Sequence, residues 1–305
     1  MEPIRVLYIM GYGRSGSTLL DTILGNHPQA ESVGELANFH RARANGEFCA
    51  CRHKANECPF WTEVWGRWRE AVGEETSRYQ ELQMRFERLR HLPRLVLGSA
   101  FASPSLKRYR RWTRALFEAV AAVSGQRVIV DSSKNPGRGF ALAGTPGLDV
   151  RLIHLVRDCR GVAYSRSKQF ERSIEAGLEK EIRPVSARST AVSWAGFNGF
   201  SSAIRRLGAG GRGMLLRYED LVAEPLPTLD AVGAVTGLDM ELLKEKLAAG
   251  ESFDFGHTVS GNRVRMTGSL RLRPDLAWTN EMPEDARRTV WRVSGPLMRS
   301  YGYRR

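Results

Sequence analysis

Cysteine is scarce in this sequence, and no long apolar run opens it. Only four cysteines occur among 305 residues, at positions 49, 51, 58 and 159. They are too few to form the disulfide framework of a domain of this size. The apolar run at residues 4–10 is short and is followed at once by Gly-Tyr-Gly-Arg, so it fits neither a signal peptide nor a membrane span. We therefore expect a cytoplasmic protein with no transmembrane segment.

Acidic residues are also in deficit. The chain has 33 acidic against 46 basic residues, which gives a net charge of +13. Such a surplus favours anionic partners, and nucleic acid, an acidic membrane surface and a multiply charged nucleotide all remain open on charge alone. At 42% hydrophobic, the sequence can build a core, and its length suits one large α/β domain with an insertion or two small domains.

Short apolar runs at residues 6–10, 128–130, 151–156 and 214–216 read as buried strands. A helix is expected at 18–24 after the first run and another from about Arg160 after the third. Strands that alternate with helices predict a parallel sheet that binds its ligand at the carboxyl ends of the strands. Each of the four runs ends in a cluster of polar or glycine residues, as such a site requires.

The stretch at about residues 40–125 interrupts this alternation. Apolar side chains there recur at helical spacing, first at Trp61, Trp65, Trp68 and Val72. A later helix that contains residues 116–123 can end at Gly125. We expect a single domain over residues 1–305: an α/β, P-loop-like three-layer sandwich with a central parallel sheet and a mainly helical insertion at about 40–125.

A glycine-rich turn follows the first strand, and Gly11 and Gly16 in it have the spacing of a Walker A loop. In such a loop, backbone N–H groups and a helix N-terminus cradle phosphate oxygens. The position that should hold lysine is Ser17, and the nearest cation is Arg14. The loop can therefore bind an anion, but it lacks the lysine that contacts the β- and γ-phosphates of a bound triphosphate. A P-loop-like kinase remains the alternative, with Asp131 as its magnesium ligand.

The segment Gly13-Arg14-Ser15-Gly16-Ser17-Thr18-Leu19-Leu20 resembles the 5′-phosphosulfate loop of sulfotransferases that use 3′-phosphoadenosine-5′-phosphosulfate (PAPS). It is most similar to the form in tyrosylprotein sulfotransferases and their bacterial relatives, as are Asn26-His27-Pro28 and Gly34-Glu35. The stretch at 155–165 resembles the family's 3′-phosphate motif, with Arg157 at a strand end and Ser165 eight positions later. The tyrosylprotein enzymes place a further arginine where this chain has Gln169, and Arg166 and Lys168 are the candidates to replace it.

Three more stretches resemble bacterial members of the family. Asp131-Ser132-Ser133-Lys134-Asn135-Pro136 matches an element whose lysine approaches the transferring group, and residues 216–221 match one whose tyrosine, here Tyr218, lies near the adenine. Residues 257–265 are similar to a late loop that covers the nucleotide. The resemblance thus implies a set of cofactor-binding residues: Gly13, Arg14, Ser15, Gly16, Ser17, Thr18, Arg157, Ser165, Tyr218, Asn262 and Arg265.

Sulfuryl transfer demands in-line geometry and stabilisation of the charge that develops on the leaving phosphate. Arg14 and Lys134 can supply that charge without a metal ion, and we place no metal in the site. Glu35 is the candidate base for the acceptor proton, unless it is only a helix-start carboxylate, in which case His40 or His27 would be examined. The expected products are a sulfated acceptor and adenosine 3′,5′-bisphosphate.

Several features stay open on the sequence alone. Cys49, Cys51, His53 and Cys58 could hold zinc, form a disulfide or simply pack. The segment Tyr109-Arg110-Arg111-Trp112 could suggest a nucleic-acid-binding module, but it reads more simply as a polar helix face, and we expect no nucleic-acid partner. The acceptor is a hydroxyl or amine on a small molecule, lipid or glycan, and neither its identity nor the oligomeric state can be read.

Overall fold

The computed structural model describes residues 2–73, 76–88, 91, 103–173, 181–208 and 212–305. Five parallel strands form its central sheet in the order β2-β3-β1-β4-β5. Their bounds are Ile4–Met10 (β1), Ala30–Ser32 (β2), Val128–Lys134 (β3), Leu148–Val156 (β4) and Gly213–Arg217 (β5). The parallel sheet predicted from the alternation of strands and helices is confirmed.

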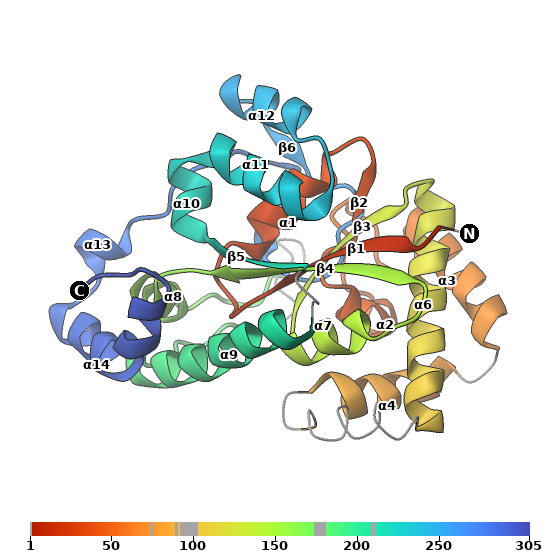
Figure 1. Cartoon of the computed structure of the whole chain (residues 1–305), viewed down its shortest axis with the longest axis horizontal. Coiled ribbons are helices and arrows are strands. Elements are labelled where there is room, and N and C mark those ends of the chain that lie inside the picture. Colours follow the sequence, from red (N-terminus) through yellow and green to blue (C-terminus); the bar gives the residue numbers. More distant parts are fainter. Residues whose placement is uncertain (1, 74–75, 89–90, 92–102, 174–180, 209–211) are drawn as a thin grey trace.

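Alternate residues of β1 serve two different cores, because successive side chains of a strand point to opposite faces. Leu7 and Ile9 belong to the core under α1 (Ser17–Gly25), α11 (Pro225–Thr236) and α12 (Glu241–Ala248). Val6 and Tyr8 belong to the core on the other face, with α7 (Pro136–Ala143). The short α10 (Tyr218–Ala223) follows β5 directly. Figure 1 shows the sheet nearly edge-on between these two layers of helices.

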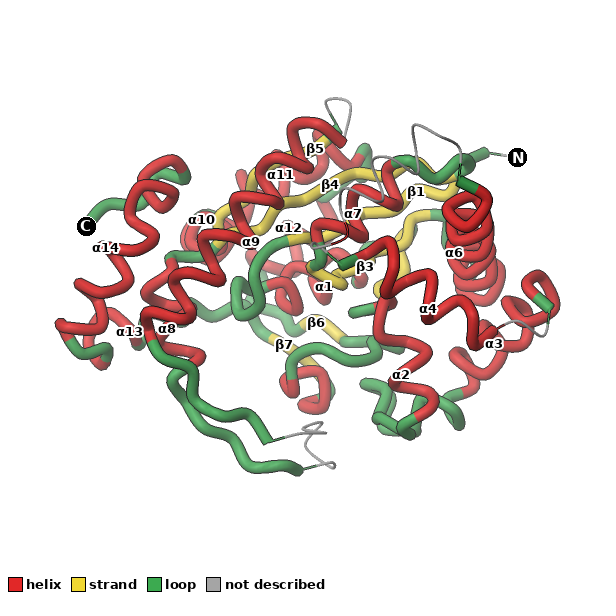
Figure 2. The backbone as a smooth tube through the Cα atoms, turned by 90° about the horizontal axis from the view of Figure 1, so that it is seen from below, coloured by secondary structure: helices red, strands yellow, loops and turns green. Residues whose placement is uncertain are grey.

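The segment predicted to be a helical insertion contains α2 (Phe39–Ala44), α3 (Pro59–Val72), α4 (Thr76–Glu87) and α6 (Pro104–Ser124). The predicted helix around Trp61 and Trp68 is confirmed, and both indoles are fully buried in the core that α3 and α6 share with the sheet. Gly125 ends α6 with a φ of 73°, as predicted. Figure 2 shows α3, α4 and α6 gathered at one end of the molecule.

A third core lies at the opposite end, between α8 (Cys159–Arg166), α9 (Ala187–Gly208) and α14 (Glu284–Ser300). The short α13 (Trp278–Glu281) packs on α8. Between α8 and α9, Phe170 and Ile182 exchange backbone hydrogen bonds of 3.0 and 2.9 Å, so the chain runs out and back as the paired loop segments of Figure 2. None of the helices in the described ranges combines the length and apolar character needed to cross a membrane.

The carboxyl end of β3 differs from expectation. The sequence predicts a strand at 128–130, but β3 continues through Lys134. Its pairing with β1 becomes irregular between Tyr8 and Met10, and Lys134 itself has a φ of 68°. This left-handed conformation is costly for a residue with a Cβ. It turns the lysine out of the regular strand at the edge where the predicted site lies.

Candidate active site

The loop between β1 and α1 is shaped for an anion. Gly16 has a φ of 92° and immediately precedes α1, whose first N–H groups face the loop. A Cβ at Gly16 would lie 2.5 Å from Cδ2 of Tyr218, so only glycine fits between the loop and that ring. Arg14 also has positive φ, 73°, and its side chain leaves the turn toward α8.

The two distant motifs of the sequence meet at Arg14. Its Nε donates to Oγ of Ser165 on α8 over 2.9 Å. Nη1 of Arg157, at the end of β4, donates to the Arg14 carbonyl oxygen over 3.3 Å. Trp194 of α9, fully buried, donates its indole N–H to the Arg157 carbonyl oxygen over 3.1 Å and so fixes the strand end. The predicted phosphate loop and 3′-phosphate motif therefore form one surface.

Tyr218 and Asp275 hold the guanidinium of Arg157. Its Cζ lies 4.5 Å from the centroid of the Tyr218 ring, a cation–π arrangement. Its Nη2 lies 2.7 Å from the Asp275 carbonyl oxygen and 3.1 Å from the carboxylate Oδ2. The Asp275 N–H donates to the Tyr218 hydroxyl over 3.0 Å. Because Asp275 is exposed and Arg157 is buried, an incoming anion can replace the carboxylate without moving the arginine.

Glu35 and Lys134 lie at the carboxyl ends of β2 and β3. The Lys134 Nζ donates to Glu35 Oε1, and both side chains are largely buried, at 20% and 16% exposed. The other oxygen of Glu35 accepts a hydrogen bond of 2.7 Å from Nδ2 of Asn38. The Glu35 N–H donates to the Val259 carbonyl oxygen over 3.1 Å, which joins this pair to the late loop.

A cavity of 340 Å³ connects these groups. The predicted site residues that line it are Gly13, Arg14, Gly16, Ser17, Thr18, Glu35, Lys134, Arg157, Ser165, Tyr218 and Asn262. Ser15 and Arg265 are buried and do not line it. Arg265 instead donates to the carbonyl oxygens of Asn262 and Phe48, at 3.5 and 3.4 Å, and so holds the late loop in place.

The charged lining residues Arg271, Arg273 and Asp275 were not predicted from the sequence. They follow the late loop, and the alternation of Arg271 and Arg273 around one apolar residue was the available signal. Five basic side chains therefore line the cavity: Arg14, Lys134, Arg157, Arg271 and Arg273. Within the part of the chain that the structure describes, Glu35 and Asp275 are its only acidic lining residues, so the cavity carries a surplus of positive charge.

The pKa of Arg14 reflects this surplus of positive charge. Burial lowers the pKa of Arg14 first, and the neighbouring charges of Arg157, Arg263 and Arg166 lower it further. The Cζ of Arg166 lies 5.5 Å from the centroid of Tyr12 in the same loop as Arg14, whereas Lys168 is exposed, with its Nζ 4.3 Å from the centroid of Tyr164. Of the two candidates to replace the family arginine at Gln169, Arg166 is thus the one placed beside the loop. A site of this charge is stabilised by a bound polyanion.

The alternative roles considered for Asp131 and the histidines fit less well. Asp131 is fully buried, with one carboxylate oxygen 2.9 Å from the Ser133 N–H and the other 3.0 Å from Nε of Arg138. It is thus engaged in the core rather than available to a magnesium ion. His40 is buried, its pKa lowered to about 3 by burial, and His27 bonds the Asp239 carbonyl oxygen at 2.8 Å. Neither histidine lines the cavity.

Comparison with known proteins agrees with the resemblance. The model of the sulfotransferase family matches residues 7–241, and the chain belongs to this family. Human carbohydrate sulfotransferase 6 is 27% identical over 181 residues, which cover 54% of this chain and 44% of the human protein. The match thus spans less than half the length of that relative.

Two solved structures share the fold. The sulfotransferase domain from the Synechococcus PCC 7002 olefin synthase has a TM-score of 0.51 and 19% identity, and the match covers 100% of this chain and 96% of that domain. The sulfotransferase domain from the curacin biosynthetic pathway has the same score and identity, with 97% and 98% covered. The predicted P-loop-like fold class with a central parallel sheet is confirmed.

Proposed function

We propose that this chain transfers a sulfuryl group from PAPS to a hydroxyl or amine acceptor. The observation that carries the proposal is the hydrogen bond between Arg14 and Ser165, which joins the loop before α1 to α8, the helix that follows β4, at one basic cavity. PAPS offers anionic groups at both ends of its ribose, and this cavity presents cations at two separated points. A nucleoside triphosphate would instead concentrate its charge at the loop.

In this proposal the N-terminus of α1 and the loop N–H groups bind the 5′-phosphosulfate, as they would any phosphate. Arg157 and Ser165 bind the 3′-phosphate, because a planar guanidinium forms paired, charge-assisted hydrogen bonds with phosphate oxygens. Asp275 would then release Arg157. Tyr218 lies against Gly16 and Arg157, so its ring can border the adenosine between the two phosphates.

The chemistry follows from which atoms gain charge. The bond between sulfur and the bridging oxygen breaks while the acceptor oxygen bonds to sulfur, and the leaving phosphate gains the electron pair. Lys134 and Arg14 stabilise that negative charge, which is a preorganised electrostatic contribution. Glu35 accepts the acceptor's proton. Since Lys134 and Glu35 are paired with each other, Lys134 must turn toward the bridging oxygen as Glu35 becomes available as a base.

Metal-independent transfer also belongs to the proposal. The carboxylate that would hold magnesium in a kinase, Asp131, is paired with Arg138, and position 17 is serine. A P-loop-like kinase is therefore the alternative function, which a transfer assay with PAPS and ATP can distinguish from sulfuryl transfer. The aromatic residues of the candidate nucleic-acid segment, Tyr109 and Trp112, are buried in the core, which supports the proposal of no nucleic-acid partner.

The acceptor belongs to the class of small molecules, lipids and glycans, and a glycan is the first to test because the human relative is named a carbohydrate sulfotransferase. We further propose one cytoplasmic domain, of bacterial type, in which the helices at about residues 40–125 border the acceptor side of the cavity.

The test is a transfer assay with sulfur-labelled PAPS against glycan, lipid and small-molecule fractions, with Lys134→Ala as the matched inactive protein. Label in an acceptor, with equimolar adenosine 3′,5′-bisphosphate, supports the proposal. Magnesium-dependent formation of ADP from ATP, with no use of PAPS, would support the kinase alternative.

A further inference from the structure

Three cysteines and one histidine converge at a point outside the cavity. Cys49, Cys51, Cys58 and His257 each present one ligand atom, and these four atoms lie within 4.8 Å of one another. The Sγ atoms of Cys51 and Cys58 are 3.5 Å apart, and Cys58 Sγ lies 3.4 Å from Nδ1 of His257. Cys49 and Cys58 are buried, while Cys51 and His257 are partly buried.

These distances match a tetrahedral metal site. With a Zn–S distance of about 2.3 Å, the sulfur atoms of a tetrahedral zinc centre are about 3.8 Å apart. The four ligand atoms need to move by less than about 1 Å to reach that geometry. Three thiolates and one imidazole form a set that binds zinc in closed structural sites, where no position remains for water or substrate. We infer that Cys49, Cys51, Cys58 and His257 hold one structural Zn²⁺.

Backbone hydrogen bonds hold the cysteines in a compact turn. The Cys49 N–H donates to the His53 carbonyl oxygen over 2.9 Å, and the Arg52 N–H donates to the Cys49 carbonyl oxygen over 2.9 Å. The Cys58 N–H donates to the Lys54 carbonyl oxygen over 2.8 Å, just before α3. These bonds fix the backbone that carries the sulfur atoms. A disulfide within the set would leave the third thiol and the imidazole without a role.

The histidine is the ligand that local spacing does not suggest. His53 lies between the cysteines in the sequence, yet His257 completes the set from 199 residues beyond Cys58. Phe60 stacks on the His257 ring with a centroid distance of 4.8 Å and an interplanar angle of 1°. The His257 carbonyl oxygen accepts a hydrogen bond of 2.6 Å from Nε1 of Trp61. The ring is thus held in place from α3.

Zinc here would join two parts of the chain at the start of the loop that lines the cavity. The segment after His257 pairs with the cysteine turn, since the Ala50 N–H donates to the Thr258 carbonyl oxygen over 3.0 Å. Val259 forms β-bridges with both Cys49 and Gly34. Asn262, a few residues on, lines the cavity. The metal therefore fixes the late loop without entering the reaction.

The direct test is metal analysis of the full chain purified without chelator. One zinc per chain is expected, and replacement by Co²⁺ should give the visible absorption of a tetrahedral thiolate-bound cobalt centre. After denaturation without reductant, all four thiols should react with an alkylating reagent. A zinc-free protein would overturn the inference, whether two thiols are then blocked as a disulfide or all four are free.

Variants identify the ligands. His257→Ala and Cys58→Ser should lose the zinc, whereas His53→Ala and Cys159→Ser should keep one zinc per chain. Cys159 is a matched control because it is a buried cysteine in the core at the other end of the molecule. If His257→Ala does not fold, the cobalt spectrum of the parent still decides the inference. Zinc retained in a folded His257→Ala and lost in His53→Ala would overturn the ligand assignment. These results are independent of whether the chain transfers sulfuryl groups.

Discussion

The side chain of Arg14 lies 2.9 Å from Oγ of Ser165, although the two residues are 151 positions apart in the sequence. Arg14 belongs to the loop before α1, and Ser165 lies on the helix that follows β4. Because β1 and β4 are adjacent parallel strands, their carboxyl ends bring both elements to one edge of the sheet. This contact makes one binding surface out of two motifs, and the predictions below test what that surface binds.

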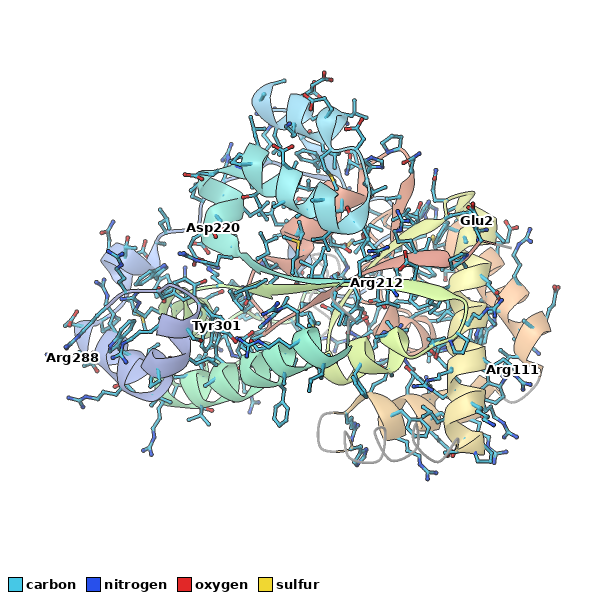
Figure 3. All side chains as sticks on the ribbon, in the orientation of Figure 1. Glu2, Arg111, Arg212, Asp220, Arg288 and Tyr301 are labelled. Atoms are coloured by element: carbon cyan, nitrogen blue, oxygen red, sulfur yellow. The ribbon has the colours of Figure 1, made fainter. Side chains whose placement is uncertain are left out.

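Arg157 should determine affinity for the 3′-phosphate. Arg157→Ala is expected to weaken binding of adenosine 3′,5′-bisphosphate by about 2 to 4 kcal/mol, because a charged hydrogen-bonding partner is lost. Adenosine 5′-phosphosulfate, which lacks the 3′-phosphate, should bind the variant and the parent almost equally. Titration calorimetry measures both. Arg212→Ala is the control, since Arg212 precedes β5 as an exposed partner of Asp149 and is labelled in Figure 3. An equal loss for both nucleotides would refute the assignment.

Lys134 and Glu35 should affect turnover more than binding. Each is proposed to act on charge that appears in the transition state, so Lys134→Ala and Glu35→Gln should lower kcat by at least about a hundredfold. Affinity for adenosine 3′,5′-bisphosphate should change little. With an acidic phenol as acceptor the base matters less, and only Glu35→Gln should recover part of its rate. If Glu35→Gln stays fully active with every acceptor, Glu35 serves only to hold Lys134 and Asn38.

Turnover should not require magnesium. Lys134 and Arg14 supply positive charge at the loop, and Asp131 is committed to Arg138 at 3.0 Å. Rates measured with added magnesium and with a brief excess of EDTA should therefore agree. Activity lost in EDTA and restored only by magnesium would contradict the proposed chemistry. Restoration only by zinc would instead implicate the cysteine and histidine site.

Gly16 should be indispensable for the shape of the loop. Gly16→Ala places a Cβ 2.5 Å from the Tyr218 ring in a residue with a φ of 92°, which should cost on the order of 1 to 3 kcal/mol of stability. Gly13→Ala is a matched control for stability, because its Cβ would meet nothing within 4 Å. Thermal unfolding of the two variants measures the difference. Equal melting temperatures would mean that the loop and Tyr218 are not in contact.

Asp21 should make stability depend on pH. Burial raises the pKa of Asp21 from 3.8 to about 7, although a hydrogen bond from Ser32 opposes the shift. Between about pH 4 and pH 7 the unfolded chain therefore holds fewer protons at this residue than the folded chain, so its contribution to stability falls as the pH rises.

The variant Asp21→Asn removes that titration. The unfolding free energy of the variant minus that of the parent should increase between about pH 4.5 and pH 7.5. The increase should be about 1.4 kcal/mol for each unit by which the pKa is shifted. Urea unfolding of both proteins at the two pH values measures this increase, and the comparison cancels the general effect of net charge. A pH-independent difference would show that Asp21 is ionised throughout.

Much of the fold could be predicted because its signals are local. Buried strands such as residues 6–10 are short apolar runs, and the helix of Trp61 and Trp68 has a clear period. The loop and the Arg157 motif are specific enough to indicate the family, and the comparisons confirm it. The roles of the individual site residues stay predictions until they are measured.

What could not be predicted depends on contacts between distant segments. Lys134 adopts positive φ where the pairing of β3 with β1 becomes irregular, and no local sequence pattern predicts that irregularity. In the sequence, Arg271 and Arg273 resemble ordinary surface charges, and only the tertiary fold places them in the lining of the cavity. His257, and not His53, belongs to the group of four ligand atoms within 4.8 Å of one another, because the late loop pairs with the cysteine turn. In each case the tertiary fold, rather than spacing, selects the residue.

The most direct test of the central claim is a calorimetric titration of the parent chain with adenosine 3′,5′-bisphosphate, ATP with magnesium, and single-stranded DNA. Arg14, Ser165 and Arg157 predict that the bisphosphate binds one molecule per chain and much more tightly than ATP, since only it carries a 3′-phosphate. DNA should show at most weak, salt-sensitive binding. Tighter binding of ATP with magnesium than of the bisphosphate would contradict the proposed use of PAPS.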